Sequence, residues 1–414
     1  MRDENRIVVT GIGVLSPFGV GTEIFWNGLI QGNCAVRKVT QFPVDSDIYP
    51  CKIASEVPEF DPWPLIRGDD PALQGRYPKL ALTALGMAIE DAGLSYETDA
   101  LRSADLYMGA AQQTGDEMET FIGYWIKEKD FMLPNDILSR IDPCAVVTAA
   151  SRIYGIGGRM INLTASCTSG ALALMLCVER IRAKRSEIGI AVGTEAISPL
   201  IFMGAGLTGE LAKRNDDPAS ASRPFDRDQD GYVLGEGAVA LVVETESYAL
   251  ARGAHIYAEL RSFAATTDAT SFKYVDETGT QMARGMTMVL NQVPANQIDY
   301  INAHGPSIVA LDTAESIAIR QAFGKFADQI PVTSIKGAIG NPSAAGGMLQ
   351  VVSGILSIRD GIIPPTINLE NPLPACDLDY VNAGSRKQKI STVFISTHGG
   401  GGLNAALTVN SSPH

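Results

Sequence analysis

The sequence lacks several features that would place the protein in a specialised class. No apolar run approaches the roughly 18 residues of a membrane-spanning helix, and the opening MRDENRIVV is charged where a secretion signal is apolar. The six cysteines include no Cys-x-x-Cys pair, so the sequence indicates neither a disulfide framework nor a thiolate metal site. The chain has only four histidines, so a His-rich metal site is not predicted. We therefore expect a cytoplasmic protein with reduced thiols, no membrane association and no metal.

Positive charge is also in short supply. The chain has 33 Lys and Arg against 46 Asp and Glu, a formal net charge of −13 at pH 7. A general nucleic-acid binder needs a basic face, so this class is excluded, and an acidic protein partner would need a local basic patch. The 414 residues, 45% of them hydrophobic, are enough for two fused halves with substantial cores.

Apolar segments of strand and helix character alternate along the chain, and no low-complexity or Pro-rich linker interrupts them. This alternation predicts an α/β protein with buried sheets. The pattern restarts near residue 250, which favours an N-terminal half over 1–250 and a C-terminal half over 251–414. The predicted strands are 6–17, 105–115, 187–198, 239–246, 256–267, 298–305 and 390–400, and the predicted helices are 78–94, 285–293 and 312–324.

Three motif-like stretches do not carry the function that they resemble. GIGVLS after the first strand has Ser16 where a dinucleotide fingerprint needs its third Gly. DRDQDG, which begins at Asp226, opens like a calcium loop, but its twelfth position is Gly237 rather than a bidentate Glu. HGGGG, which begins at His398, lacks the Lys-Ser/Thr of a phosphate-binding loop. Nucleotide and calcium binding are therefore not predicted.

Cys167 lies at a turn between a short predicted strand and an apolar helix that begins near Ser169 and Gly170. A small buried hydrophobe would explain many cysteines. At the start of a helix, however, unpaired N–H groups and the positive end of the helix dipole favour a thiolate over a thiol. Cys167 is thus either a packing residue or a nucleophile.

Polar residues in three later loops could complete a reactive site. His304 follows an apolar strand, Lys336 and Asn341 lie in the small-residue loop TSIKGAIGNPSAAGG, and the glycines after His398 offer unobstructed backbone N–H groups. Loops at the carboxyl ends of strands commonly carry the sites of α/β proteins. A lone His in such a loop is also often an ordinary loop residue. Together with a thiol, these groups are suited to acyl transfer.

Five motifs in order along the chain resemble those of one enzyme family: TASCTSGALAL, SRPFDRDQDGYVLGEGA, NAHGPS, PPTINLENP and HGGGGLNAALTV. The sequence is similar to the β-ketoacyl-acyl-carrier-protein synthases, specifically the elongating ketosynthase group of the thiolase-like superfamily. The resemblance covers essentially the whole chain. It implies a thiolase-like duplicated α/β fold with five layers, α-β-α-β-α, and a dimer formed around the nucleophile region.

The resemblance also implies roles for individual residues. Cys167 matches the nucleophile that takes the acyl group, and His304 matches the first of two histidines that assist decarboxylation of a malonyl extender. Lys336 matches a supporting lysine, with Glu315 as its acidic partner. The backbone N–H groups of Cys167 and Gly400 match the oxyanion hole.

Several positions depart from the family pattern. Asn341 replaces the second histidine, as in the initiating ketosynthases, which use Cys, His and Asn. HGPSI stands where the family has HGTST, so Pro306 and Ile308 replace two threonines whose hydroxyls hold the pantetheine arm. GGGGLN stands where the family has GFGGTN, so Gly400 removes the phenylalanine that gates the acyl pocket and Leu403 replaces a threonine. The altered positions lie around the expected reaction chamber.

From this resemblance we expect a condensing acyltransferase acting on acyl-carrier-protein thioesters in fatty-acid or polyketide synthesis. The alternative is a non-elongating or chain-length-factor-like partner subunit of a heterodimer. No cofactor is expected beyond the phosphopantetheine that the acyl carrier protein itself carries.

The expected contacts with the carrier and its arm are Lys213, Arg214 and Ser307, and Arg76 and Lys79 form a second basic cluster. Acyl chain length, extender unit and the choice between homodimer and heterodimer remain open at this stage.

Overall fold

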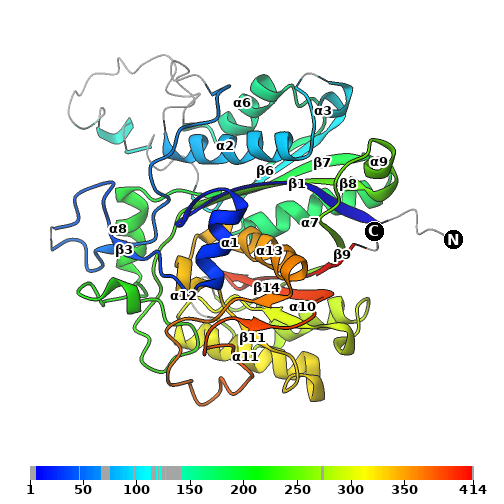
Figure 1. Ribbon diagram of the computed structural model, residues 1–414. Coiled ribbons are helices and arrows are strands. Elements are labelled where there is room, and N and C mark those ends of the chain that lie inside the picture. Colours follow the sequence, from blue (N-terminus) through cyan, green and yellow to red (C-terminus); the bar gives the residue numbers. More distant parts are fainter. Residues whose placement is uncertain are drawn as a thin grey trace.

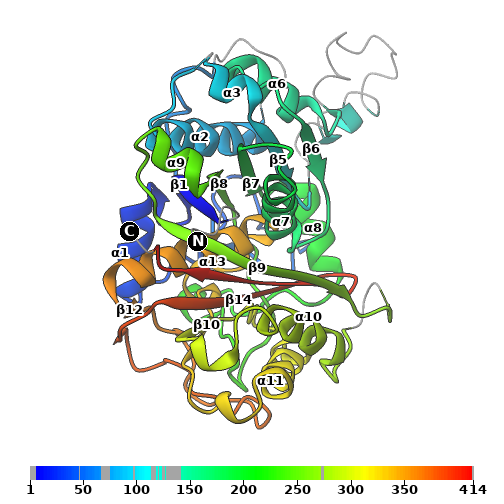
Figure 2. The same ribbon diagram turned by 90° about the vertical axis from the view of Figure 1, so that its right-hand side faces the viewer.

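Two stacked sheets and three helical layers make up the molecule (Figures 1 and 2). The computed structural model describes residues 6–45, 47–66, 75–96, 98–112, 118–119, 121–123, 126, 141–271 and 275–412. The end of the predicted strand 105–115 lies outside these residues. In the described part of the chain, no helix has both the length and the apolarity needed to cross a bilayer.

The first sheet has the order β1-β8-β7-β5-β6, and the second has the order β9-β15-β14-β10-β11. In each sheet the first two pairings are antiparallel and the last two are parallel. This repeated pattern is what a duplicated fold produces. The strands are β1 (Ile7–Ser16), β8 (Gly237–Thr245), β7 (Ile188–Glu195), β5 (Asp105–Gly109), β6 (Met160–Leu163), β9 (Ala258–Thr267), β15 (Leu403–Asn410), β14 (Thr392–Gly399), β10 (Tyr300–Asn302) and β11 (Val332–Thr333).

The two sheets are joined edge to edge where β1 pairs with β9, through Val8 with Glu259 and Val9 with Ala258. Helix α2 packs on the outer face of the first sheet and α10 on the outer face of the second, while α7 and α13 lie between the sheets. The five layers therefore follow the order α-β-α-β-α. The layer-forming helices are α2 (Arg76–Asp91), α6 (Ala145–Tyr154), α7 (Ser169–Arg182), α13 (Ser343–Asp360), α10 (Thr280–Leu290) and α11 (Val309–Phe323).

Shorter elements complete the described chain. They are α1 (Thr22–Ile30), α3 (Asp99–Ser103), α8 (Pro199–Leu207), α9 (Glu246–Ala251), α12 (Lys336–Ile339), β2 (Gly19–Val20), β3 (Arg37–Lys38), β4 (Ile53–Ala54), β12 (Ile362–Ile363), β13 (Arg386–Lys387) and the 3₁₀ turns Pro218–Ser220, Ala295–Gln297 and Gly324–Phe326. The predicted strands and helices are confirmed, with ends that shift by a few residues. The strand predicted over 298–305 is only three residues long, so His304 lies in the loop beyond it.

The two helices between the sheets approach each other closely at their first turns. A Cβ on Gly170 of α7 would lie 2.4 Å from the Ala344 carbonyl oxygen of α13, a distance that no real side chain tolerates. Residue 170 must therefore be glycine for this approach to occur. The consequence is that the segment before α7, which carries Cys167, and the segment before α13, which carries Asn341, meet at one place.

Candidate active site

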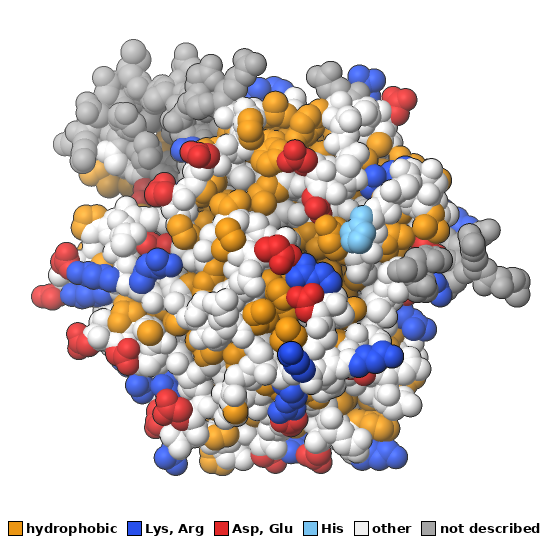
Figure 3. Space-filling view, in the orientation of Figure 1, with side chains coloured by type: hydrophobic (Ala, Val, Ile, Leu, Met, Phe, Trp, Pro, Cys, Tyr) orange, Lys and Arg blue, Asp and Glu red, His pale blue; other side chains and the backbone are white. Residues whose placement is uncertain are grey.

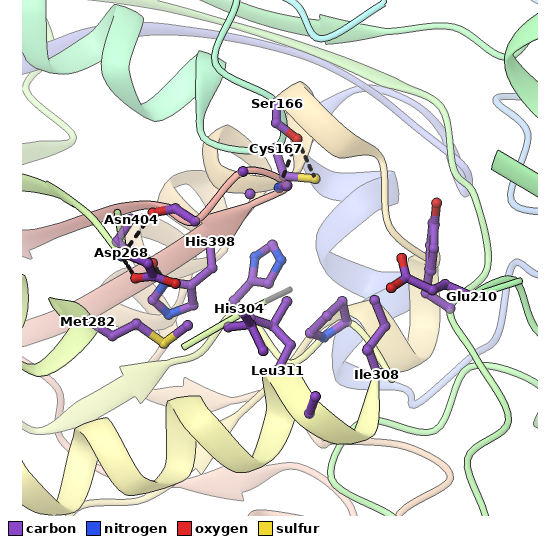
Figure 4. Close-up of a pocket in the computed structure, with 18 of the residues that line it drawn as sticks. Ser166, Cys167, Glu210, Asp268, Met282, His304, Ile308, Leu311, His398 and Asn404 are labelled. Carbon is purple, nitrogen blue, oxygen red and sulfur yellow. Dashed lines mark hydrogen bonds between the residues drawn. The ribbon is translucent and has the colours of Figure 1, made fainter. Parts of the chain in front are cut away.

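Two pockets meet at Cys167. The first, of about 260 Å³, lies on the His304 side and beside the glycine loop (Figure 4). The second, of about 550 Å³, extends toward α8 and is lined by apolar side chains that include Ile197, Leu200 and Ile201. Both are lined by Ser166, Cys167, Tyr232 and Asn341. The thiol thus lies where a smaller pocket adjoins a larger one.

The turn that carries Cys167 is fixed by short hydrogen bonds between neighbours. The Thr168 hydroxyl donates to the Ala165 carbonyl at 2.6 Å, and the Ser169 hydroxyl donates to the Ser166 carbonyl at 2.6 Å. These hydroxyls occupy the turn just before α7, where backbone groups have no helical partner. Cys167 is half-buried and its thiol faces both pockets.

His304 is buried, and its ring is contacted by a cation. Lys336 Nζ lies 3.2 Å from His304 Nδ1 and donates to the His304 carbonyl oxygen at 2.8 Å. Burial lowers the pKa of His304 well below its usual value, and the charge of Lys336 lowers it further. The imidazole is therefore neutral at pH 7. Because the lysine ammonium donates to Nδ1, the ring proton is assigned to Nε2.

Lys336 is itself buried at the start of α12. Burial lowers its pKa to about 8, although the nearby carboxylate of Glu315 acts in the opposite direction. Its third neighbour is Gln350, whose Oε1 lies 3.4 Å from Nζ. Lysine at this position thus stays mostly protonated at pH 7.

Within the described residues, Glu315 does not form the expected ion pair with Lys336, and its carboxylate lies beside the His398 ring instead. Nε2 of His398 lies 3.3 Å from Oε1 of Glu315, without good hydrogen-bond geometry. Glu315 also accepts hydrogen bonds from the backbone N–H groups of His304 and Gly305, both at 2.8 Å, and from the Ser396 hydroxyl. The carboxylate therefore shapes the His304 loop directly and reaches Lys336 only through space.

Burial acts to raise the pKa of Glu315, but the contacts with His398 and Ser396 outweigh burial and hold that pKa below its usual value. Glu315 is therefore an anion. Nδ1 of His398 lies 2.9 Å from Oδ1 of Asn404, whose Nδ2 donates to Asp268 at 2.7 Å. Because the Asn404 oxygen must accept, His398 donates from Nδ1, and its Nε2 faces the anion.

Sequence reasoning missed His398, whose ring centroid lies 5.6 Å from that of His304. The sequence predicts the HGGGG stretch as a source of backbone N–H donors and gives the His398 side chain no role. The two-residue period of β14 is the signal that could have found it, because residues 396 and 398 share one face of a strand. It also missed Glu195, whose burial raises its pKa to about 7 and which lines the second pocket.

Asn341 lies beside the thiol. Its backbone N–H donates to the Val233 carbonyl at 2.7 Å and its carbonyl accepts from Gly235 at 3.0 Å, which fix the loop. The side-chain Nδ2 lies 3.7 Å from Cys167 Sγ, and the buried Oδ1 has no partner among the described residues. Its amide donor thus points at the reacting atom.

Gly400 lies in the glycine loop that follows β14, and its N–H donates to the Ser166 hydroxyl at 3.0 Å. The loop lines the first pocket through backbone alone at residues 399–402. Cys167, His304, Asn341 and Gly400 thus line the first pocket together, while Lys336 and Glu315 contact His304 without lining it.

The residues predicted to contact the carrier and its arm differ in their exposure to solvent. Ser307 is buried and does not line either pocket, because its hydroxyl donates to the Gly231 carbonyl at 3.0 Å and accepts from the Arg223 N–H at 3.0 Å. The Ser307 hydroxyl is thus engaged within the protein, and its role in holding the pantetheine arm stays a prediction. Lys213 is exposed. Arg214 is half-buried and donates to the Asp228 carbonyl at 2.8 Å.

Arg76, from the second basic cluster, is half-buried and its charge is paired within the protein. Its Nη2 lies 2.8 Å from the buried carboxylate of Glu236. On the face shown in Figure 3, acidic and basic side chains are interspersed among the described residues, which form no broad basic area there.

Known proteins resemble this chain over nearly all of its length. Residues 4–249 match the β-ketoacyl synthase N-terminal domain, and residues 257–370 match the β-ketoacyl synthase C-terminal domain. A 3-oxoacyl-[acyl-carrier-protein] synthase 2 of Coxiella burnetii is 36% identical over 422 residues, 99% of each chain. The tetracenomycin polyketide synthase ketoacyl synthase alpha subunit of Streptomyces glaucescens is 35% identical over 419 residues, 98% of this chain and 97% of that protein.

Solved structures agree with the fold. A β-ketoacyl synthase from Burkholderia phymatum has a TM-score of 0.91 at 28% identity, covering 99% of this chain and 100% of that chain. The ishigamide ketosynthase/chain length factor has a TM-score of 0.90 at 28% identity, covering 99% of both chains. A type II polyketide ketosynthase in complex with its acyl-carrier protein has a TM-score of 0.88 at 29% identity, again covering 99% of both chains.

Proposed function

The chain belongs to the β-ketoacyl synthase family of condensing enzymes, and on that premise we propose that it elongates acyl chains with a Cys-His-Asn site. Cys167 is the nucleophile, and His304 and Asn341 are the donors. Lys336 and Glu315 hold His304. The substrate is an acyl thioester on an acyl carrier protein, and the extender is a malonyl-type thioester.

The observation that carries this proposal is the position of the Asn341 amide, 3.7 Å from Cys167 Sγ, in a pocket that His304 also lines. In the first step the Cys167 thiolate attacks the thioester carbonyl, and the carrier thiol leaves. The N–H groups of Cys167 and Gly400 stabilise the oxyanion. The acyl chain extends into the apolar second pocket toward α8.

In the second step an extender thioester enters the first pocket and loses CO₂. The electron pair of the broken C–C bond forms an enolate, whose oxygen accepts hydrogen bonds from His304 Nε2 and Asn341 Nδ2. The enolate carbon then attacks the acyl group on Cys167, and the thiolate leaves. Lys336, which donates to His304 Nδ1, keeps the Nε2 proton facing the enolate.

We propose that the chain divides into an N-terminal half, residues 1–250, and a C-terminal half, residues 251–414. Both halves supply residues to the site. The first brings the nucleophile, and the second brings His304, Lys336, Asn341 and the glycine loop. A carrier protein would dock near Lys213, which lies three residues beyond Glu210, a lining residue of the first pocket.

Asn341→Ala tests the function. Losing one enolate donor should slow condensation by about 10²- to 10³-fold while Cys167 is still acylated, and Asn341→His, which restores an N–H donor, should retain most of the rate. Mass spectrometry of the protein mixed with acyl- and malonyl-carrier protein measures both steps. Unchanged condensation in Asn341→Ala would remove this residue from the mechanism.

A second candidate is a non-catalytic partner subunit in a heterodimer. Pro306 and Ile308, which line the first pocket in place of hydroxyl-bearing residues, favour it, and similarity to a ketosynthase/chain length factor structure gives it a precedent. Absence of any acylation of Cys167 without a second ketosynthase-like chain would support this candidate over elongation.

A further inference from the structure

The hydroxyl of Ser166 lies between two groups of the proposed reaction (Figure 4). Its Oγ accepts a hydrogen bond from the Gly400 N–H at 3.0 Å and donates toward Cys167 Sγ at 3.9 Å. An oxyanion held by Gly400 would need to lie at roughly 2.7–3.1 Å from the same nitrogen. The serine oxygen therefore stands where a thioester oxygen would have to go.

The backbone directs the hydroxyl into this place. Ser166 has φ of 52, in the left-handed region that residues other than glycine rarely adopt. The conformation is held because the Ser166 carbonyl accepts from both the hydroxyl and the N–H of Ser169, at 2.6 and 3.1 Å. Such a costly conformation persists only where the surroundings enforce it.

The glycine loop is shaped to receive this side chain. A Cβ on Gly399 would lie 3.1 Å from Ser166 Cβ and 3.1 Å from the Cys167 nitrogen. A Cβ on Gly400 would lie 3.4 Å from Ser166 Oγ. Without side chains, the loop comes close enough for its N–H to reach the hydroxyl.

The other donor of the proposed oxyanion hole is the backbone N–H of Cys167, which differs from Gly400 in its hydrogen bonding. Among the described residues, no acceptor is recorded for the Cys167 N–H. One donor is thus available to a substrate and the other is already bonded within the protein.

We propose that Ser166 occupies the oxyanion hole of the resting protein, and that its hydroxyl turns away before a thioester oxygen accepts from Gly400. This inference rests on the proposed acylation of Cys167. The bond from Gly400 N–H to Ser166 Oγ breaks, and a bond from the same N–H to the thioester oxygen replaces it. Acylation therefore competes with an internal acceptor, which disfavours thioesters that are weakly held in the pocket.

Ser166→Ala tests the proposal through two reactions of the same thiol. Acylation by a small acyl-N-acetylcysteamine thioester uses the oxyanion hole, whereas alkylation by iodoacetamide does not. Removing the competing acceptor should speed acylation by about 3- to 10-fold, the effect of one neutral hydrogen bond. Alkylation should change less than twofold, so the ratio of the two rates rises.

Two further variants make the result specific. Ser166→Gly removes the hydroxyl and also relieves the left-handed strain, so it must raise the ratio as Ser166→Ala does. Ser343→Ala removes a hydroxyl that lies 3.7 Å from the thiol, and Ser343 has no recorded contact with Gly400 among the described residues, so the ratio should stay constant. Slower acylation at constant alkylation would make Ser166 an oxyanion donor and overturn the proposal. Equal changes in both rates would also overturn it.

Amide hydrogen exchange at Gly400 keeps the proposal testable if the protein is not acylated at all. Loss of the hydroxyl should speed exchange of the Gly400 N–H in Ser166→Ala, measured by NMR of glycine-labelled protein, because the N–H loses its acceptor. If Cys167 is not acylated but exchange of the Gly400 N–H is faster in Ser166→Ala, the proposed function is rejected and the position of Ser166 in the oxyanion hole is supported. Unchanged exchange of the Gly400 N–H would reject the proposal that Ser166 occupies the oxyanion hole.

Discussion

Lys336 is a buried lysine whose ammonium group contacts His304 in the site. Its ammonium contacts the ring and the carbonyl oxygen of His304, and its side chain has almost no exposed surface. Within the described residues no carboxylate lies within ion-pair distance of it, because Glu315 contacts His398 instead. Holding this cation therefore costs free energy that other contacts must offset.

That cost should be visible as a pH dependence of stability. The pKa of Lys336 is about 8 in the folded protein against 10.5 ordinarily, so between these values the unfolded chain binds more protons. The free energy of unfolding of the wild type should rise relative to that of Lys336→Met by on the order of 3 kcal/mol as pH increases from 8 to 10.5. Urea unfolding of both proteins at several pH values measures the difference.

Below pH 8 the difference between the two proteins should be constant, since Lys336 is protonated in both the folded and unfolded states. A difference that stays flat up to pH 10.5 would contradict a buried lysine of lowered pKa. Any constant offset from lost packing or hydrogen bonds does not affect this slope.

At the scale of elements, β14 supplies three consecutive contacts to the site. Ser396 and His398 reach Glu315, while Thr397, on the opposite face of the strand, lies 3.4 Å from His304 Nδ1. One strand therefore organises both the carboxylate and the imidazole, and the glycine loop begins directly after it.

His398→Leu should reveal how strongly the strand and α11 depend on the buried pair. The substitution removes the ring nitrogen that lies 3.3 Å from the buried Glu315 carboxylate, and the loss of a partner for a buried polar group typically costs about 1–3 kcal/mol of unfolding free energy. Adding Glu315→Gln should make the double variant more stable than the sum of the single losses by at least about 1 kcal/mol. Urea denaturation of the four proteins gives this coupling.

His255, which is exposed, provides the matched control. His255→Leu should change stability by less than about 0.5 kcal/mol. Additive losses in the double variant would show that His398 and Glu315 do not interact energetically.

The elements themselves could be predicted from sequence because their apolar periodicity depends only on local residues. The helix predicted at 78–94 and the strands around it formed as α2, β1 and β8. The pairing of Glu315 could not be predicted, because it depends on which face of β14 meets α11. The contacts of Ser307 could not be predicted either, because its left-handed φ of 73° and the bond from its hydroxyl to the Gly231 carbonyl depend on a segment distant in the sequence.

At the scale of the whole molecule, the proposed function requires an acyl carrier protein to dock on a chain with a net charge of −13. The lining of the first pocket includes the acidic residues Glu210, Asp268 and Glu277, so long-range attraction of an acidic partner is weak and exposed lysines near the pocket matter more. Lys213 is such a lysine, whereas the guanidinium of Arg214 is bound to the Asp228 carbonyl.

Lys213→Glu should slow acylation by acyl-carrier protein several-fold at low salt and less at high salt, because ions screen the exposed charge. Acylation by the N-acetylcysteamine thioester, which has no carrier, should be unchanged. Lys389→Glu, an exposed charge reversal outside the pocket lining, serves as the control. An equal effect of both reversals would reflect net charge alone and exclude docking at Lys213.

The buried helix α13 also determines what happens if the chain is interrupted. Ala344–Ser357 is buried throughout, and the helix packs on β7 and α7 of the other half. By contrast, Gly253, in the turn between α9 and β9, is exposed and has open space around it. A nick at this turn would leave the shared core intact, so the two fragments should remain associated as a complementing pair. Neither fragment should fold alone, because each would expose the surface that α13 covers.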